Sequence, residues 1–222
     1  DELVSSRGGA RTEVPDTLDA QMVVDAKLAL ENGSKMQLSY NVENTQRAIG
    51  TRLSSHIVRR FGMTGLREGH ILVRLRGSAG QSLGAFATQG LRLDVIGDAN
   101  DYVGKGLSGG MIVVRPSAAV GFVASANTII GNTVLYGATS GKMFAAGQAG
   151  ERLCVRNSGA TAVVEGSGSN ACEYMTGGNV VILGAVGDNF GAGMTGGMAF
   201  IYDEAGNFES RVNRESLQLF RI

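Results

Sequence analysis

Two glycine-rich segments have the spacing of a loop that could bind a dinucleotide. The G-x-G-x-x-G pattern occurs at residues 104–109 and again at residues 191–196. In dinucleotide-binding folds these glycines let the backbone approach a pyrophosphate, but the pattern must follow a strand and open a helix. Here apolar runs of strand type follow both patterns, at residues 111–114 and 198–202. The sequence therefore predicts backbone corners at these glycines and no cofactor site.

Other residues with ligand chemistry are few and poorly spaced. Residues 137–143 resemble a phosphate-binding loop, but one residue is missing between the glycines and a methionine replaces the hydroxyl residue that would reach magnesium. Residues 97–101 have the acidic spacing of a calcium-binding turn, but their counterpart at residues 187–190 lacks the second acid, which favours ordinary turn chemistry. His56 and His70 are the only histidines and have no metal-ligand spacing, so solvated or capping roles are predicted.

Cys154 and Cys172 are the only cysteines, and they are 18 residues apart. Each lies five residues before a repeated glycine, Gly159 or Gly177, so the two should stack on neighbouring layers about 5 Å apart. This spacing favours two small buried residues in a column, and a zinc or redox pair is the alternative. Two cysteines predict no disulfide framework.

A glycine pattern repeats along most of the chain. Of the 34 glycines, 30 lie in residues 61–222, and copies of a Ser/Thr-Gly pattern followed by apolar residues recur 18, 18 and 19 residues apart. A period of this length, with β-type runs such as residues 134–136 and 180–183, is typical of a solenoid of short strands. At roughly 20 residues per coil we predict a parallel β-helix of about seven coils. Glycine can form corners where φ must be positive, at no Cβ cost. The glycines of the repeat, which we expect to be structural, are Gly104, Gly106, Gly109, Gly110, Gly141, Gly159, Gly177, Gly178, Gly191, Gly193, Gly196 and Gly197.

The first part of the chain predicts helices instead. A helix capped by Asp16 is expected to run to about Asn32, with Gly33 after its end. Residues 36–40 alternate as in a short strand, and a second helix is expected over residues 51–61. The apolar stripe of the first helix consists of Leu18, Met22, Val23, Ala26, Leu28 and Leu30.

The change in glycine content divides the chain into a linker with a helical lead-in, residues 1–60, and a β-helix, residues 61–222. A rod of stacked coils has two open ends whose strand edges must be covered, and the helices can cover one of them. Charge is balanced, with 20 Lys+Arg against 20 Asp+Glu, which gives no electrostatic case for nucleic acid. No apolar run of membrane-spanning length and no secretory signal at residues 1–7 is visible, so a cytoplasmic location is predicted.

Five segments, taken in order, resemble one protein family. The family is the C-terminal glycine-rich (GXGXG) domain of the glutamate synthase large (alpha) subunit. The sequences of the segments most resemble the bacterial NADPH-dependent type. The resemblance extends from about Thr17 to the end of the chain. The segments that carry it are residues 47–50, 77–86, 97–110, 130–141 and 147–152.

The resemblance implies a right-handed β-helix inside a larger enzyme, so the expected fold is an all-β solenoid with short N-terminal helices. The parent enzyme makes two L-glutamates from L-glutamine and 2-oxoglutarate. Its amidotransferase domain uses a cysteine nucleophile and passes ammonia through a tunnel to a barrel domain with FMN and a 3Fe-4S cluster. A small (beta) subunit with FAD and 4Fe-4S clusters supplies electrons from NADPH. None of these catalytic or cofactor residues can be assigned to this chain, because neither Cys154 nor Cys172 occupies the nucleophile's position and two cysteines cannot supply three cluster ligands.

We expect a structural domain that holds the amidotransferase and FMN domains in place and is inactive alone. The expected partners are those domains and the small subunit, with neither nucleic acid nor membrane. The alternatives are a free-standing carbohydrate-acting or carbohydrate-binding β-helix, and a left-handed acyltransferase helix, which would show a hexapeptide period. Charged candidates for docking are Arg47, Arg52, Arg59 and Arg60.

Overall fold

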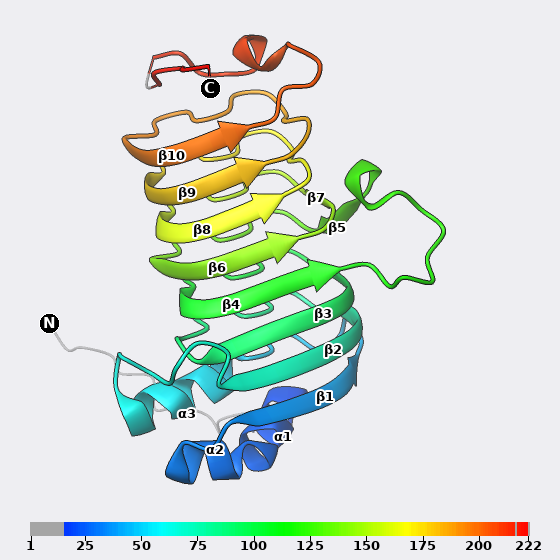
Figure 1. The fold of residues 1–222 in the computed structure, drawn as a ribbon, viewed down its shortest axis with the longest axis vertical. Helices are drawn as coiled ribbons and strands as arrows, with labels where there is room; N and C mark the ends of the chain where they lie inside the picture. Colours follow the sequence, from blue (N-terminus) through cyan, green and yellow to red (C-terminus); the bar gives the residue numbers. More distant parts are fainter. Residues whose placement is uncertain (1–15, 216, 222) are drawn as a thin grey trace, which may run out of the picture.

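Parallel strands stacked one above another form the body of the molecule (Figure 1). The computed structural model describes residues 16–215 and 217–221. Each strand of the main path pairs in parallel with the strand of the next layer, while the connecting segments return behind the stack. The strands of this path are β1 (Met36–Val42), β2 (Ile71–Ala79), β3 (Leu91–Ala99), β4 (Ser108–Arg115), β6 (Ser140–Ala145), β8 (Ser158–Val164), β9 (Thr176–Ile182) and β10 (Gly196–Ile201). Two short strands, β5 (Thr128–Ile130) and β7 (Gln148–Ala149), pair with each other on another wall.

Alternation along the strands builds the core. Because successive residues of a strand point to opposite faces, every second residue enters the interior and the others face outward. The inward side chains stack in register between layers, and no tryptophan is needed to fill this narrow space. The buried columns consist of Ile71, Val73, Leu75, Leu91, Leu93, Val95, Ile112, Val114, Met143, Ala145, Ala162, Val164, Val180 and Ile182.

The N-terminal helices lie at the base of the stack, the first two below β1 and the third beside it (Figure 1). The predicted first helix is instead two, α1 (Leu18–Asp25) and α2 (Lys27–Asn32), and Thr17 rather than Asp16 caps α1 by accepting from the Ala20 amide. The predicted apolar stripe fails at Leu28, which is 57% exposed, because α2 turns Ala29 and Leu30 toward the core instead. The second helix, α3 (Thr51–Phe61), has the predicted bounds.

A buried carboxylate joins these helices. Asp19 in α1 is 4% exposed, and its two oxygens accept the amide protons of Gly50 at 3.0 Å and Arg52 at 2.5 Å, at the start of α3. Burial raises the pKa of Asp19, and the bonds from Arg52 and Gly50 oppose that rise. The carboxylate thus satisfies amides that would otherwise be unpaired at a helix N-terminus that has no side-chain cap of its own.

One predicted strand is wrong, and one predicted boundary stays open. Residues 134–136 form a turn, with Leu135 at φ 58°, because the wall behind the strands is built from stacked turns. The predicted strands at 36–40 and 111–114 are confirmed as parts of β1 and β4, and the one at 180–183 as part of β9, which ends one residue earlier at Ile182. The division at residue 60 remains a prediction, although the sheet takes β1 from the segment before it. Residues 1–7, where no secretory signal is predicted, lie outside the described residues.

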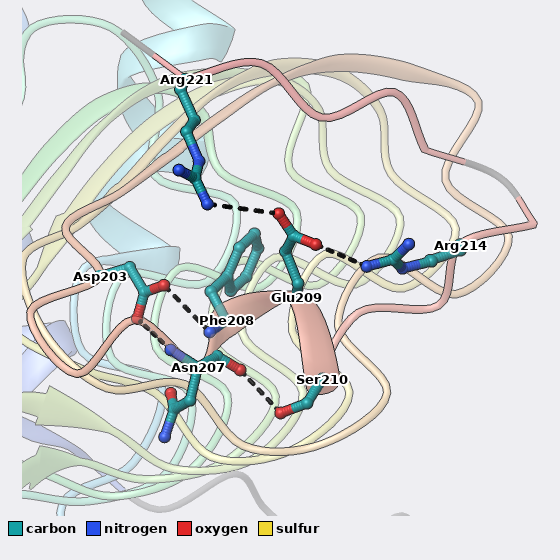
Figure 2. Close-up of polar contacts among 7 residues, drawn as sticks. All are labelled: Asp203, Asn207, Phe208, Glu209, Ser210, Arg214 and Arg221. Carbon is teal, nitrogen blue, oxygen red and sulfur yellow. Dashed lines mark hydrogen bonds and ion pairs between the residues drawn. The ribbon is translucent and has the colours of Figure 1, made fainter.

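The C-terminal segment covers the other end of the stack (Figure 1). A 3₁₀ turn, η2 (Phe208–Ser210), places the Phe208 ring against Phe190 edge-on, with centroids 5.2 Å apart. Figure 2 shows the polar contacts that hold this turn: the Asp203 carboxylate accepts from the Asn207 and Phe208 amides, each at 3.1 Å. The Glu209 carboxylate lies between two arginines: Oε2 is 2.6 Å from Nη2 of Arg214, and Oε1 is 3.9 Å from Nη2 of Arg221 (Figure 2). The two ends of the strand stack are therefore covered differently: helices lie at the N-terminal end, and a turn held by an aromatic contact lies at the C-terminal end.

The first prediction tests the Asp19 clamp. Replacing Asp19 with alanine leaves the buried Gly50 amide and the half-buried Arg52 amide without their acceptor, so the free energy of unfolding should fall by about 2 kcal/mol. Asp16→Ala is the matched control, since Asp16 caps nothing, and it should change stability by less than about 0.5 kcal/mol. Chemical denaturation of the 222-residue chain, followed by circular dichroism, measures both. An equal loss of unfolding free energy in the two variants would contradict a stabilising role for the bonds that Asp19 accepts from Gly50 and Arg52.

Candidate functional site

The turns behind the strands contain a column of residues in the left-handed conformation. Successive layers place Gly104, Leu135, Cys154, Cys172 and Gly191 at the same position, with φ between 58° and 71°. Each donates its amide to a carbonyl of the layer below, at 2.7–2.8 Å. The G-x-G spacing thus marks turns that hydrogen-bond from layer to layer.

Three of these five positions hold a residue with a Cβ, at a cost of roughly 1–2 kcal/mol each in the left-handed region. Their side chains point into the core, where Leu135, Cys154 and Cys172 are fully buried. Burying a leucine side chain contributes about 1.5–3 kcal/mol, which offsets the strain. Core filling therefore decides whether glycine or an apolar residue occupies a given layer.

A second group of glycines lies where two layers approach closely. Eight of the twelve predicted structural glycines have positive φ, but Gly110, Gly159, Gly177 and Gly196 do not. The left-handed conformation therefore accounts for eight of the twelve and not for these four. A Cβ at Gly177 would collide with the Ser158 carbonyl oxygen and approach its carbon to 3.0 Å. Glycine is needed there because the backbones touch.

Neither G-x-G-x-x-G segment opens a helix. Gly109 lies in strand β4, and Gly196 begins strand β10. The strands predicted after both motifs are confirmed, and the helix that a dinucleotide site requires is absent from these two places. In the first motif the Gly104 amide donates to the Leu83 carbonyl and the Gly106 amide to the Tyr136 carbonyl, so these two amides already bond to neighbouring layers.

The two cysteines lie in neighbouring layers, as the spacing predicts. Both are free thiols and fully buried, and the Cys172 amide donates to the carbonyl of Leu153, the residue before Cys154. Burial raises the pKa of Cys172 to about 12 and raises that of Cys154, to which the neighbouring Cys172 also contributes. Both groups are therefore protonated at neutral pH, which is the state of an unreactive core thiol.

The histidines and the predicted docking arginines lie around the helices. His70 contacts the Gly33 carbonyl through Nε2, and His56 lies on α3, as predicted. Arg60 donates to the Glu31 carbonyl at 3.0 Å, so one of the four arginines is already used within the fold. In residues 16–215 and 217–221, no three His, Cys, Asp or Glu side chains are grouped as around a metal ion.

The comparisons with known proteins agree with the fold. A protein-family model described as the GXGXG motif matches residues 19–222. The chain belongs to the GXGXG family. It is 69% identical over 212 residues to the glutamate synthase (NADPH) large chain of Azospirillum brasilense, covering 96% of this chain and 14% of that protein. The corresponding large chain of Bacillus subtilis is 49% identical over 193 residues, 86% of this chain and 13% of that protein.

A relative named for another electron donor is also similar. The ferredoxin-dependent glutamate synthase 2 of Synechocystis is 48% identical over 207 residues, 92% of this chain and 13% of that protein. The GXGXG domain therefore spans about one seventh of the length of the curated relatives it matches. The resemblance to the bacterial NADPH-dependent large chain is confirmed, while the expected activity belongs to proteins several times longer. No helix in the described part of the GXGXG domain has the length and hydropathy needed to cross a bilayer.

The second prediction tests the close approach between layers. Gly177→Ala places a methyl group against the Ser158 carbonyl and should lower the free energy of unfolding by about 2–3 kcal/mol. Gly121→Ala is the matched control, because nothing lies within 4 Å of a Cβ there. Its free energy of unfolding should stay within about 0.5 kcal/mol of that of the unsubstituted domain. Guanidinium unfolding curves measure the free energy of unfolding of both variants. A Gly177→Ala variant as stable as the unmodified domain would contradict the close contact between the layers.

The third prediction concerns the pH dependence of the thiols. Because the Cys172 pKa is raised from 9.0 to about 12 in the folded domain, its contribution to stability is present below pH 9 and is lost as pH rises toward 12. At pH 9 iodoacetamide should therefore modify Cys154 and Cys172 only after unfolding. Ser55→Cys adds an exposed thiol as an internal control, which should react in the folded domain. Alkylation of Cys154 or Cys172 in the folded, unsubstituted domain, or a disulfide between them, would contradict this prediction. Mass spectrometry detects both modifications.

Proposed function

We propose that this GXGXG domain is a non-catalytic spacer in the large chain of an NADPH-type glutamate synthase. That enzyme would form two L-glutamates from L-glutamine and 2-oxoglutarate. In this proposal the domain holds the amidotransferase and FMN domains in place, and FMN, the 3Fe-4S cluster and the small subunit's FAD and 4Fe-4S clusters belong to other parts of the enzyme. Its partners are those domains and, in the whole enzyme, the small subunit, in the cytoplasm.

The observation that carries the proposal is the unbroken parallel stack with its filled interior. Each layer bonds to the next over most of its length, from β1 through β10, so a bend would break backbone hydrogen bonds. Stacked layers at about 4.8 Å make a rod whose length is fixed by the number of layers. Such a rod keeps two attached domains at a constant separation, as a reaction shared between distant sites requires.

The winding itself is part of the proposal. We infer a right-handed β-helix of about seven coils, because parallel neighbours joined by crossover connections are right-handed in nearly all proteins. We also propose that the twelve predicted glycines have structural roles only. Gly104 and Gly177 illustrate the two roles, a left-handed turn and a close contact between layers.

The relatives support a role that does not depend on the electron donor. The similar proteins include enzymes named for NADPH, for NADH and for ferredoxin, with the last two at 48–50% identity over 92% of this chain. A domain shared by all three is suited to the part of the reaction that they have in common. The free-standing carbohydrate-acting alternative has no counterpart among these relatives.

The fourth prediction tests the spacer in the full-length large chain with its small subunit. A flexible Gly/Ser linker in place of residues 36–214 should lower glutamine-dependent glutamate formation at least about tenfold, because the two active sites lose their fixed separation. Hydrolysis of glutamine and ammonia-dependent glutamate formation, which each need one site, should remain. Full glutamine-dependent activity without the domain would contradict the proposal. Turnover by the isolated 222-residue chain supplied with FMN would contradict it as well.

A further inference from the structure

One layer of the stack carries an insertion. Residues that face each other on neighbouring strands are 18–20 positions apart from β2 onward, except between Met111 of β4 and Lys142 of β6, which are 31 apart. The additional residues form the loop 116–127, which projects from the side of the rod between β4 and β5 (Figure 1, green). Insertions in a solenoid lie outside the repeat and often form its binding face.

The loop exposes apolar side chains to water. Val120, Phe122 and Val123 are 40%, 45% and 67% exposed. The loop is held at its base, where the Gln148 side chain donates to the Ser125 carbonyl at 2.8 Å, and within itself by the Asn127 side chain bonded to the Val123 carbonyl at 2.8 Å. A fixed loop that presents apolar side chains to water is suited to contact with another protein surface.

A groove with two arginines lies beneath the loop. It has a volume of about 820 Å³, and Phe122 and Val120 from the loop and Ile96 from β3 contribute its apolar lining. Arg76 and Arg115 flank Ile96 in register, one layer below and one above, so their positions are two layers apart, roughly 10 Å. Both arginines are exposed, and in the described part of the chain neither forms an ion pair.

The charges of the groove favour an acidic occupant. Asp98 at the rim is the one acid among its lining residues, against two guanidinium groups that can each bind a carboxylate through two hydrogen bonds. The apolar lip formed by the loop would shield such pairs from water, which strengthens them. The groove thus fits a segment that combines carboxylates with apolar side chains.

We propose that this groove, lined by loop 116–127, Arg76 and Arg115, binds an acidic and partly apolar segment from another part of the same large chain. The proposal rests on the proposed function and names where the spacer is attached. The relative that is 69% identical extends over about seven times the length matched here, so most of such a chain is available as the occupant. Attachment through an inserted loop would fix the rotation of the rod about its axis, which stacked layers alone do not fix.

The fifth prediction tests this site by photocrosslinking in the full-length large chain with its small subunit. p-Benzoylphenylalanine at position 122 should crosslink to an acidic segment outside the matched domain. Mixing isotope-labelled and unlabelled chains distinguishes a link within one chain from a link between two copies. The double variant Arg76→Glu/Arg115→Glu should reduce the yield about tenfold, because it replaces two attractive pairs with like charges. Arg74→Glu, on the same strand and exposed but not in the groove lining, should retain the yield within about twofold.

A second measurement covers the case in which the double variant fails to fold. Raising salt from about 0.05 to 0.5 M should lower the yield of the chain that keeps Arg76 and Arg115, because both pairs become screened. Links mainly to a second copy or to the small subunit, no link at all, or a yield insensitive to both charge reversal and salt would overturn the site. If glutamine-dependent activity still requires the domain in that case, the spacer function stands and only this attachment is lost.

Discussion

The contact between the backbones of adjacent layers is the constraint on which the structure depends. The layers come so close that a methyl group at Gly159, Gly177 or Gly196 would meet a carbonyl oxygen of the layer below. That spacing lets each strand bond to its neighbour, and it lets the turns behind the strands donate amides from layer to layer as well. A side chain inserted at one of these points would separate both walls at once. Glycine at these three positions is thus a condition for the stacking of the layers.

Strain and burial are balanced separately in each layer. Gly104 and Gly191 occupy the left-handed turn position without a Cβ, while Leu135, Cys154 and Cys172 occupy it with an inward side chain. The price of the left-handed conformation is about the same in each layer, but the space to be filled is not. In β8 two of the three buried residues are the alanines Ala160 and Ala162, and the turn of that layer adds the buried side chain of Cys154. This accounts for a repeat whose period is regular and whose residues are not.

Elements with a periodic apolar or glycine pattern could be predicted from the sequence, whereas contacts and insertions outside that pattern could not. Helix α3 and the strand after each G-x-G-x-x-G motif follow from local apolar spacing, and the stacked cysteines follow from the period. Residues 134–136 look like a strand because Val, Leu and Tyr favour strands, yet the interlayer bonds of Leu135 hold a left-handed turn. The clamp by Asp19 and the contact of Phe208 with Phe190 join residues far apart in sequence or unrelated to the repeat, so no local pattern announces them. The spacing of 31 residues at the fourth layer was the visible signal for the inserted loop.

Covered ends leave the side walls for attachment. The helices α1 and α2 lie below β1, and the turn around Phe208 lies above the last layer, so each end of the stack has a covering segment. A regular wall would let a partner shift by one layer, about 4.8 Å, at little cost, because each layer offers nearly the same surface. An insertion present in one layer removes that ambiguity: loop 116–127 and the two arginines beside Ile96 have no counterpart one step up or down. A rod with the spacer function proposed above needs such a feature, because stiffness fixes its length but only an irregular contact fixes its register.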